Sequence, residues 1–137
     1  MSRERTFAMI KPDAIRTHCI GKIISMIEDN GFDIIRLQKI QLTKEKAERF
    51  YAVHSYRPFF GELVAHVTSG PVIIMALEKE NAVAAWRKLM GATDPAQAAP
   101  GTVRALYGTN IGQNATHGSD SPETACEELG LFFPELM

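Results

Sequence analysis

Six consecutive apolar residues in the middle of the chain constrain its fold more than any other feature. The run Val-Ile-Ile-Met-Ala-Leu covers residues 72–77, and Gly70-Pro71 interrupts the chain just before it. A half-exposed strand alternates apolar and polar residues, whereas a strand covered on both faces reads as an unbroken apolar run. We therefore predict a strand at this position whose two faces are both buried.

Two further segments have the pattern of strands. Thr6–Ile10 is a short apolar run, and the charged residues of Lys11-Pro12-Asp13 mark its exit. Residues 35–38 alternate in the manner of a strand. The alternation changes parity at Lys39-Ile40, which indicates a bulge there.

Helices are predicted between and after these strands. Isoleucines recur at helical spacing in residues 20–27, and Thr43 and Ser121 are suitable N-caps for later helices. The order strand, helix, strand, helices, strand, helix is typical of an α+β protein. We expect a ferredoxin-like sandwich, in which helices pack on one antiparallel sheet, and a single domain over residues 1–137. The remaining helices are expected around residues 59–67, 82–89 and 102–107.

Charge and cysteine content exclude several classes of protein. Fifteen Lys and Arg against sixteen Asp and Glu give a net charge of -1, so a general affinity for nucleic acid or anionic lipid has no support. No apolar stretch reaches the roughly 18 residues that a membrane helix needs. Cys19 and Cys126 are too few for a disulfide scaffold and have no metal-ligand spacing. We expect a cytoplasmic protein that binds neither a membrane nor a specific nucleic acid.

One long segment lacks periodicity and is the expected place of the chemistry. Residues 91–118 are rich in Gly, Pro, Ala and Thr, and compact domains rarely keep such a segment without a function. It contains His117, whose neutral imidazole can act as a nucleophile near pH 7. We interpret Gly118 as a residue that lets a large ligand approach the imidazole. The other histidines, His18, His54 and His66, are interpreted as surface or structural residues.

Cations and aromatic residues elsewhere are ambiguous when each is taken alone. Lys11, Arg87 and Arg104 can be solvated surface charges or phosphate ligands, because guanidinium and ammonium groups both suit phosphate oxygens. Phe59 and Phe60 can be core residues or can stack on a base.

The octapeptide from Asn114 to Ser121 resembles a known family motif, and this resemblance favours a binding role for these cations and aromatic residues. It reads N-A-T-H-G-S-D-S and closely resembles the N-x-x-H-G-S-D-S signature of the nucleoside diphosphate kinase family. The chain is similar to short prokaryotic members over essentially its whole length. The other matching segments, in the family's order, are residues 4–7 (ERTF), 10–13 (IKPD), 57–60 (RPFF), 69–72 (SGPV), 91–95 (GATDP) and 100–104 (PGTVR).

The resemblance implies a mechanism. Members transfer the γ-phosphoryl group from a nucleoside triphosphate to a nucleoside diphosphate by a ping-pong route, with broad base and sugar tolerance. His117 would become a phosphohistidine. Glu128 would accept a hydrogen bond from the other ring nitrogen, and Ser119 would orient Glu128. Tyr51 would bond near the phosphohistidine.

The resemblance also implies how the nucleotide is held. Lys11, Arg87, Thr93 and Arg104 would bind its phosphates, and Mg²⁺ would arrive on those phosphates rather than in a cage of protein ligands. Members assemble as dimers, tetramers or hexamers, so a homo-oligomer is expected, without a choice among these sizes. Asn114, together with Lys11, would bind the ribose 3′-hydroxyl, and Phe59 and Ile111 would line the two faces of the base.

Three departures and two alternatives accompany this reading. Ala14, Ala105 and Gln113 stand where relatives often have Gly, Gly and Arg, and none of the three has a proposed catalytic role. The same sandwich could instead be a nucleotide-binding or regulatory module, which needs no nucleophile. It could also be a nucleic-acid-binding domain, which the near-neutral charge disfavours.

Overall fold

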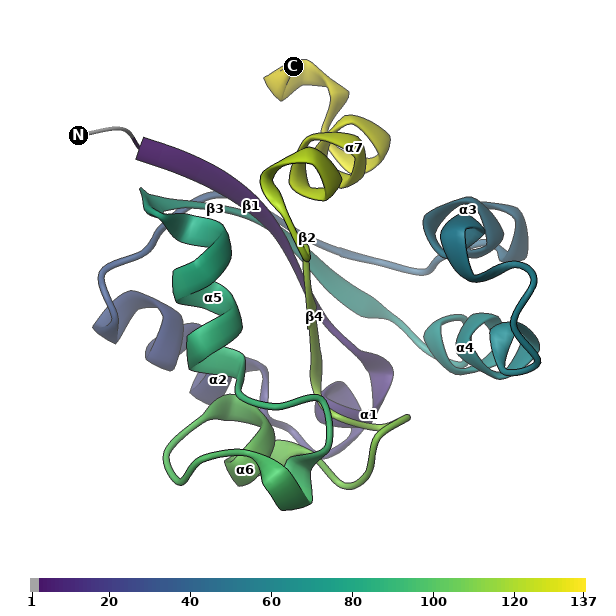
Figure 1. Cartoon of the computed structure of the whole chain (residues 1–137), viewed down its shortest axis with the longest axis horizontal. Helices are drawn as coiled ribbons and strands as arrows, with labels where there is room; N and C mark the ends of the chain where they lie inside the picture. Colours follow the sequence, from purple (N-terminus) through teal and green to yellow (C-terminus); the bar gives the residue numbers. More distant parts are fainter. Residues whose placement is uncertain (1–2) are drawn as a thin grey trace.

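A four-stranded antiparallel sheet forms the centre of the molecule. The computed structural model describes residues 3–137, and its strands are β1 (Arg3–Ile10), β2 (Asp33–Ile40), β3 (Val72–Glu80) and β4 (Thr116–Gly118). Their order in the sheet is β2-β3-β1-β4, and every neighbouring pair is antiparallel (Figure 1). The predicted α+β ferredoxin-like sandwich is confirmed.

The apolar run at residues 72–77 lies in β3 and is buried on both faces, as predicted. Ile73, Met75 and Leu77 belong to one core cluster, while the alternate residues Val72, Ile74 and Ala76 belong to a second cluster across the sheet. Each of the six is at most 4% exposed. Because successive side chains of a strand point to opposite faces, one unbroken apolar segment supplies both layers of the core.

Helices cover the two faces in two groups. Residues of α2 and α5 fill the cluster on one face, and residues of α3, α4 and α7 fill the cluster on the other (Figure 1). The helix bounds are α1 Pro12–Arg16, α2 Ile20–Asp29, α3 Lys44–Phe50, α4 Phe60–Val67, α5 Ala82–Met90, α6 Val103–Tyr107 and α7 Pro122–Phe132. Short 3₁₀ turns cover Ala52–His54, Pro95–Gln97 and Pro134–Leu136.

The predicted helix caps are present. The hydroxyl of Thr43 accepts a hydrogen bond from the backbone N–H of Lys46, and that of Ser121 accepts one from the N–H of Thr124. Each bond satisfies an N–H group that has no partner within its helix. The cap at Ser121 fixes the start of α7, the helix that carries Glu128.

Several local predictions were wrong. The bulge in β2 lies between Ile34 and Arg36 instead of at Lys39-Ile40. The charged exit of β1 is present at Lys11 and Asp13, but both residues are buried, each 6% exposed and with buried partners. Helix α1 and strand β4 were not predicted. Strand β4, at one edge of the sheet, pairs His117 with Met9 of β1 and thereby fixes the position of the histidine.

Within residues 3–137, no helix is both long enough and apolar enough to cross a membrane.

Candidate active site

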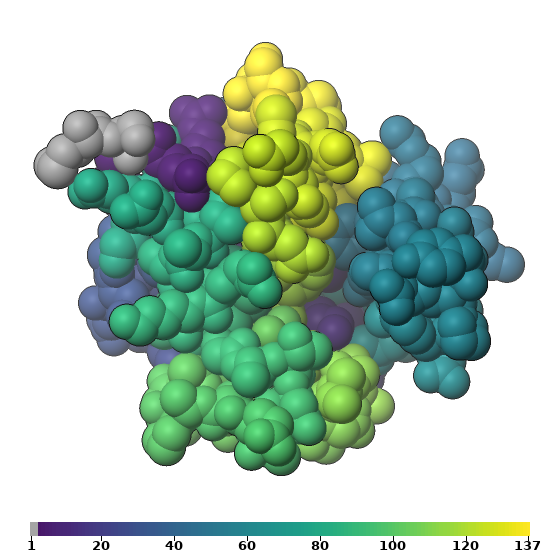
Figure 2. All heavy atoms as spheres, in the orientation of Figure 1, coloured from purple at the N-terminus to yellow at the C-terminus, as the bar shows by residue number. Residues whose placement is uncertain are grey.

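One large cavity opens between the α3–α4 segment and the segment from β4 to α7. Figure 2 shows the molecule hollowed between the teal atoms on the right and the yellow-green atoms of the C-terminal part. The cavity has a volume of about 1100 Å³. Ser119 is not in its wall, but every other candidate site residue is: Lys11, Tyr51, Phe59, Arg87, Thr93, Arg104, Ile111, Asn114, His117 and Glu128.

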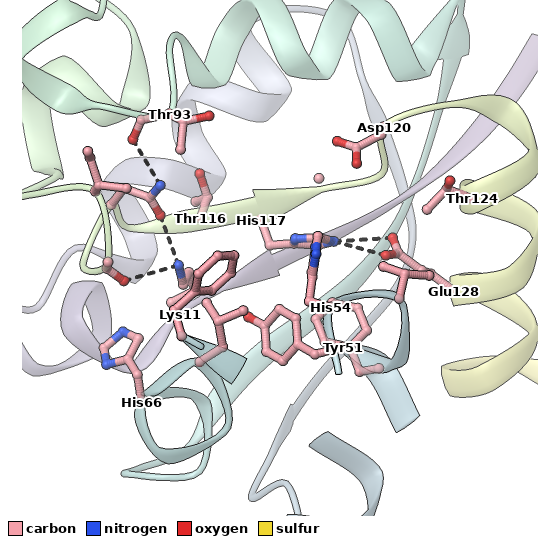
Figure 3. A pocket seen from close by; sticks show the side chains of 18 of the residues that line it. Lys11, Tyr51, His54, His66, Thr93, Thr116, His117, Asp120, Thr124 and Glu128 are labelled. Atoms are coloured by element: carbon pink, nitrogen blue, oxygen red, sulfur yellow. Dashed lines mark hydrogen bonds and ion pairs between the residues drawn. The ribbon is translucent and has the colours of Figure 1, made fainter. Parts of the chain in front are cut away.

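His117 stands in the cavity wall with one ring nitrogen bonded. Its Nε2 lies 3.1 and 3.2 Å from the two carboxylate oxygens of Glu128, which α7 brings beside β4 (Figure 3). The hydroxyl of Ser119 donates to one of the same oxygens at 2.6 Å. A carboxylate only accepts hydrogen bonds, so Nε2 carries the proton and Nδ1 keeps its lone pair. Nδ1 has no hydrogen-bond partner within the described residues 3–137.

Aromatic side chains hold the plane of the imidazole. The ring of Phe50 contacts it edge-on, with ring centroids 4.7 Å apart and planes at 73°, and Phe7 lies behind at 6.2 Å. Phe50 lies in α3, whose N-cap Thr43 was predicted, but no role in the site was predicted for Phe50. The helical stripe does signal that Phe50 is buried, but it carries no information on which residue lies opposite.

Lys11 joins the end of β1 to the loop before β4. Its ammonium group donates to Oδ1 of Asn114 at 2.9 Å and to the carbonyl of Gly112 at 3.3 Å. The amide of Asn114 in turn donates to the carbonyl of Thr93 at 3.0 Å, so Asn114 links Lys11 to Thr93; the latter two are labelled in Figure 3. Burial, aided by the charge of Arg104 and opposed by that of Asp13, lowers the pKa of Lys11 to about 8.

Arg104 is the more buried of the two candidate arginines. Its guanidinium donates to the carbonyls of Gly91 and Thr116, both at 3.0 Å, and its side chain therefore ties α5 to β4. Burial and the neighbouring charge of Arg87 lower its pKa. Arg87 is exposed and donates to the carbonyl of Asp120 at 3.3 Å. The two guanidinium groups concentrate positive charge on the wall that also holds His117.

Tyr51 and the base-binding candidates come from other parts of the wall. Tyr51 is only 7% exposed, and burial together with the charge of Glu128 raises the pKa of its phenol. Phe59 and Ile111 are 40% and 60% exposed, which is unusual for large apolar side chains that line a cavity. Arg57 lies over the Phe59 ring at 5.7 Å, within the range of a cation–π contact.

The expected reason for Gly118 was wrong. Its missing side chain does not make room for a ligand, because a Cβ there would lie 2.5 Å from the Trp86 ring and 2.6 Å from Met90. Gly118 therefore faces the α5 layer of the core. Trp86 also donates its indole N–H to the carbonyl of His117 at 3.3 Å.

Several cavity residues had no predicted role in the site, among them His54, which was interpreted only as surface or structural. His54 and Glu127 both line the cavity, as does the exposed Asp120. Residues 3–137 contain no group of three or more His, Cys, Asp or Glu side chains arranged to hold a metal ion. Mg²⁺ commonly binds proteins through one or two carboxylates plus substrate phosphates, and the position of Asp120 fits that manner of binding.

Comparison with known proteins finds similar sequences of one family. A family model described as nucleoside diphosphate kinase matches residues 4–137. A relative named nucleoside diphosphate kinase from Geobacter sp. (strain M21) is 56% identical over 133 residues, which cover 97% of each chain. One of the same name from Bdellovibrio bacteriovorus is 58% identical, over 97% of this chain and 94% of the relative.

Solved structures agree as well. The nucleoside diphosphate kinase of Aquifex aeolicus superposes with a TM-score of 0.96 at 44% identity, and the match covers 98% of both chains. A nucleoside diphosphate kinase from Halobacterium salinarum in complex with CDP gives a TM-score of 0.93 at 42% identity, over 96% of this chain and 88% of the other.

Proposed function

The chain belongs to the nucleoside diphosphate kinase family, and from that premise we propose that His117 carries the phosphoryl group between nucleotides. The protein is a phosphotransferase that moves the γ-phosphoryl group of a nucleoside triphosphate to a nucleoside diphosphate. One observation carries the proposal for His117: a carboxylate bonds one ring nitrogen and leaves the other free in the cavity wall.

In the first half-reaction, the Nδ1 lone pair attacks the γ-phosphorus of the donor. The bond between that phosphorus and the bridging oxygen breaks, and the nucleoside diphosphate leaves with the electron pair. The ring keeps its Nε2 proton, so the positive charge that develops on it faces Glu128. A terminal oxygen of the acceptor then attacks the phosphohistidine in the same cavity, which restores neutral imidazole.

Four residues would hold the phosphates. Lys11, Arg87 and Arg104 supply positive charge around the transferring group, and the hydroxyl of Thr93 adds a donor at the cavity wall. Arg104 uses two of its N–H groups on backbone carbonyls, but a guanidinium has five, so donors remain for phosphate oxygens. The buried hydroxyl of Tyr51 would bond near the phosphohistidine.

The sugar and the base would bind towards the other end of the cavity. Asn114 and Lys11, already bonded to each other, would hold the ribose 3′-hydroxyl. Phe59 and Ile111 would line the two faces of the base. Stacking and apolar contact do not read the hydrogen-bonding edge of a base, so broad base specificity follows.

Mg²⁺ would bind mainly to the nucleotide phosphates. It would neutralise charge on the transferring group. Asp120 lines the cavity beside Arg87, and its exposed carboxylate would hold water molecules bound to the ion.

Three broader properties belong to the same proposal. Residues 1–137 would form one domain, since both core clusters of the described chain share one sheet. The protein would act in the cytoplasm, where thiols such as the free Cys19 and Cys126 stay reduced. It would form a homo-oligomer, because β2 lies at the edge of the sheet and leaves Leu37 44% exposed.

Nucleotide exchange tests the function directly. Protein mixed with ATP, GDP and Mg²⁺ should produce GTP and ADP, measured by ion-exchange chromatography. His117→Ala should still bind ADP but should form no GTP. His18→Asn is the matched control, because His18 is exposed, and asparagine tolerates its left-handed backbone, with φ of 62°. Exchange by His117→Ala at the rate of the unchanged protein would refute the assignment.

A further inference from the structure

Ala115 has a backbone conformation that alanine rarely adopts. Its φ is 74°, in the left-handed region, and the residue is completely buried. The Cβ of an L-residue in that region crowds the following carbonyl oxygen, so the conformation persists only where the surroundings hold it. Ala115 separates Asn114 from the strand that presents His117, and its conformation therefore sets the relative direction of both side chains.

Residues 11–13 bond to Ala115 on both sides. Its backbone N–H donates to Oδ2 of Asp13 at 3.0 Å, and its carbonyl accepts from the backbone N–H of Lys11 at 2.8 Å. The sequence separation between Asp13 and Ala115 is 102 residues. Asp13 is thus the side chain that satisfies a buried N–H in the strained turn.

The carboxylate of Asp13 is itself held in one orientation. Its other oxygen, Oδ1, lies 3.1 Å from Nε2 of His66, a residue of α4 that lies at the Lys11 end of the cavity (Figure 3). The Asp13 side chain is 7% exposed. Burial by itself raises the pKa of Asp13, but the bonds from His66 and Ala115 and the charge of Lys11 together hold it below its usual value.

We propose that Asp13 is a positioning residue for phosphoryl transfer. It keeps the backbone of Ala115 left-handed, so that the side chains of His117 and Asn114 both line the cavity. This inference rests on the proposed function. With φ of Ala115 in the ordinary negative range, the chain direction would change between Asn114 and Thr116. The chain could then not keep the Lys11–Asn114 hydrogen bond and, at the same time, direct His117 into the cavity.

Two substitutions of Asp13 separate positioning from charge. Asp13→Ala removes the acceptor and should lower kcat/KM for ATP and GDP by 10- to 100-fold. Asp13→Asn keeps an oxygen for the N–H of Ala115, and its amide can donate to His66 in that residue's other tautomer. It should therefore stay within about fivefold of the unchanged protein. The charge of Asp13 raises the pKa of Lys11, so both substitutions lower that pKa further. Because both remove the same charge, a difference in activity between Asp13→Ala and Asp13→Asn at pH 6.5 does not come from Lys11.

A second-site change supplies the sharper test. Glycine adopts positive φ without strain. Adding Ala115→Gly to Asp13→Ala should therefore raise kcat/KM at least fivefold above that of Asp13→Ala alone. Ala115→Gly alone is the reference for this comparison. Circular dichroism and thermal unfolding of each variant show whether it is folded. An unfolded Asp13→Ala leaves the comparison of Asp13→Asn with the unchanged protein as the test.

Three results would overturn the inference. One is a folded Asp13→Ala variant with unchanged kcat/KM, and another is a double variant no more active than Asp13→Ala. A loss of activity in Asp13→Asn equal to that in Asp13→Ala would likewise assign the effect to charge rather than to positioning. Absence of exchange in the unchanged protein would instead refute the proposed function, so the two failures can be told apart.

Discussion

At the scale of single residues, the site depends on which nitrogen of His117 is bonded. Glu128 holds Nε2 with both carboxylate oxygens close, and Ser119 bonds one of those oxygens. The carboxylate therefore has little freedom to rotate, and the imidazole keeps one tautomer. Glu128 does not need to take a proton in this chemistry; it orients the ring and stabilises the charge that develops on it.

Replacing Glu128 by Gln tests this role. The amide keeps the shape of the side chain but loses the charge, so kcat should fall 10- to 100-fold, on the order of 1.4–2.8 kcal/mol of barrier. Glu123→Gln is the control in the same steady-state assay, since Glu123 is exposed on the same helix and lies outside the cavity. Equal kcat values for the two variants would mean that Glu128 does not act on His117.

Lys11 gives the enzyme a predicted pH dependence. Its pKa is lowered to about 8, so the free enzyme loses this positive charge as pH rises through that value. The kcat/KM for nucleotides, which reports the free enzyme, should fall through the same range. Bound phosphates favour the charged form of lysine, so the fall in kcat should lie at higher pH. A kcat/KM profile that stays flat from pH 7 to 9.5 would contradict the role of Lys11.

At the scale of elements, the three-residue strand β4 determines how the site is presented. Strand alternation puts His117 on the sheet face of Met9 and puts Thr116 and Gly118 on the opposite face, and the cavity at this edge of the sheet reaches all three. On that face, Trp86 and Met90 of α5 occupy the space where a side chain at position 118 would lie. The nucleophile is thus fixed by close packing behind it.

Gly118→Ala should consequently destabilise the protein. A Cβ at this position would lie 2.5 Å from the ring of Trp86, which is completely buried. Overpacking of this kind costs about 1–3 kcal/mol of unfolding free energy, measurable by urea denaturation. Gly21→Ala is the control, because a Cβ at Gly21 meets nothing within 4 Å. Equal stability of Gly118→Ala and Gly21→Ala would contradict the packing described here.

The sequence predicted those elements whose signals are local. The unbroken run in β3 and the caps at Thr43 and Ser121 act within a few residues, and the structure has them where they were predicted. Strand β4 is too short to carry periodicity and consists of Thr, His and Gly. Its pairing with β1, a long-range contact, stabilises it. The bulge in β2 was misplaced because several registers of an exposed edge strand fit the same alternation.

At the scale of the whole molecule, the cavity is assembled from segments far apart in the chain. Lys11 and Asn114, which bond directly, are separated by 103 residues. No local pattern in the sequence encodes such a contact, and Lys11 alone reads as a surface charge. The candidate residues could be predicted only through the resemblance of several motifs in the same order. The further partners of the site, such as Phe50 and Asp13, required the structure.

The most direct test of the central claim is to find where the phosphoryl group resides between the two half-reactions. Protein incubated with γ-³²P-labelled ATP and Mg²⁺, without an acceptor, should retain an acid-labile, base-stable label. Peptide mapping should place that label on His117, and NMR of the phosphopeptide should place it on Nδ1, since Glu128 bonds Nε2. Added GDP should remove the label as GTP. Label on another residue or on Nε2, or an absence of label in a protein that exchanges phosphoryl groups, would contradict the mechanism.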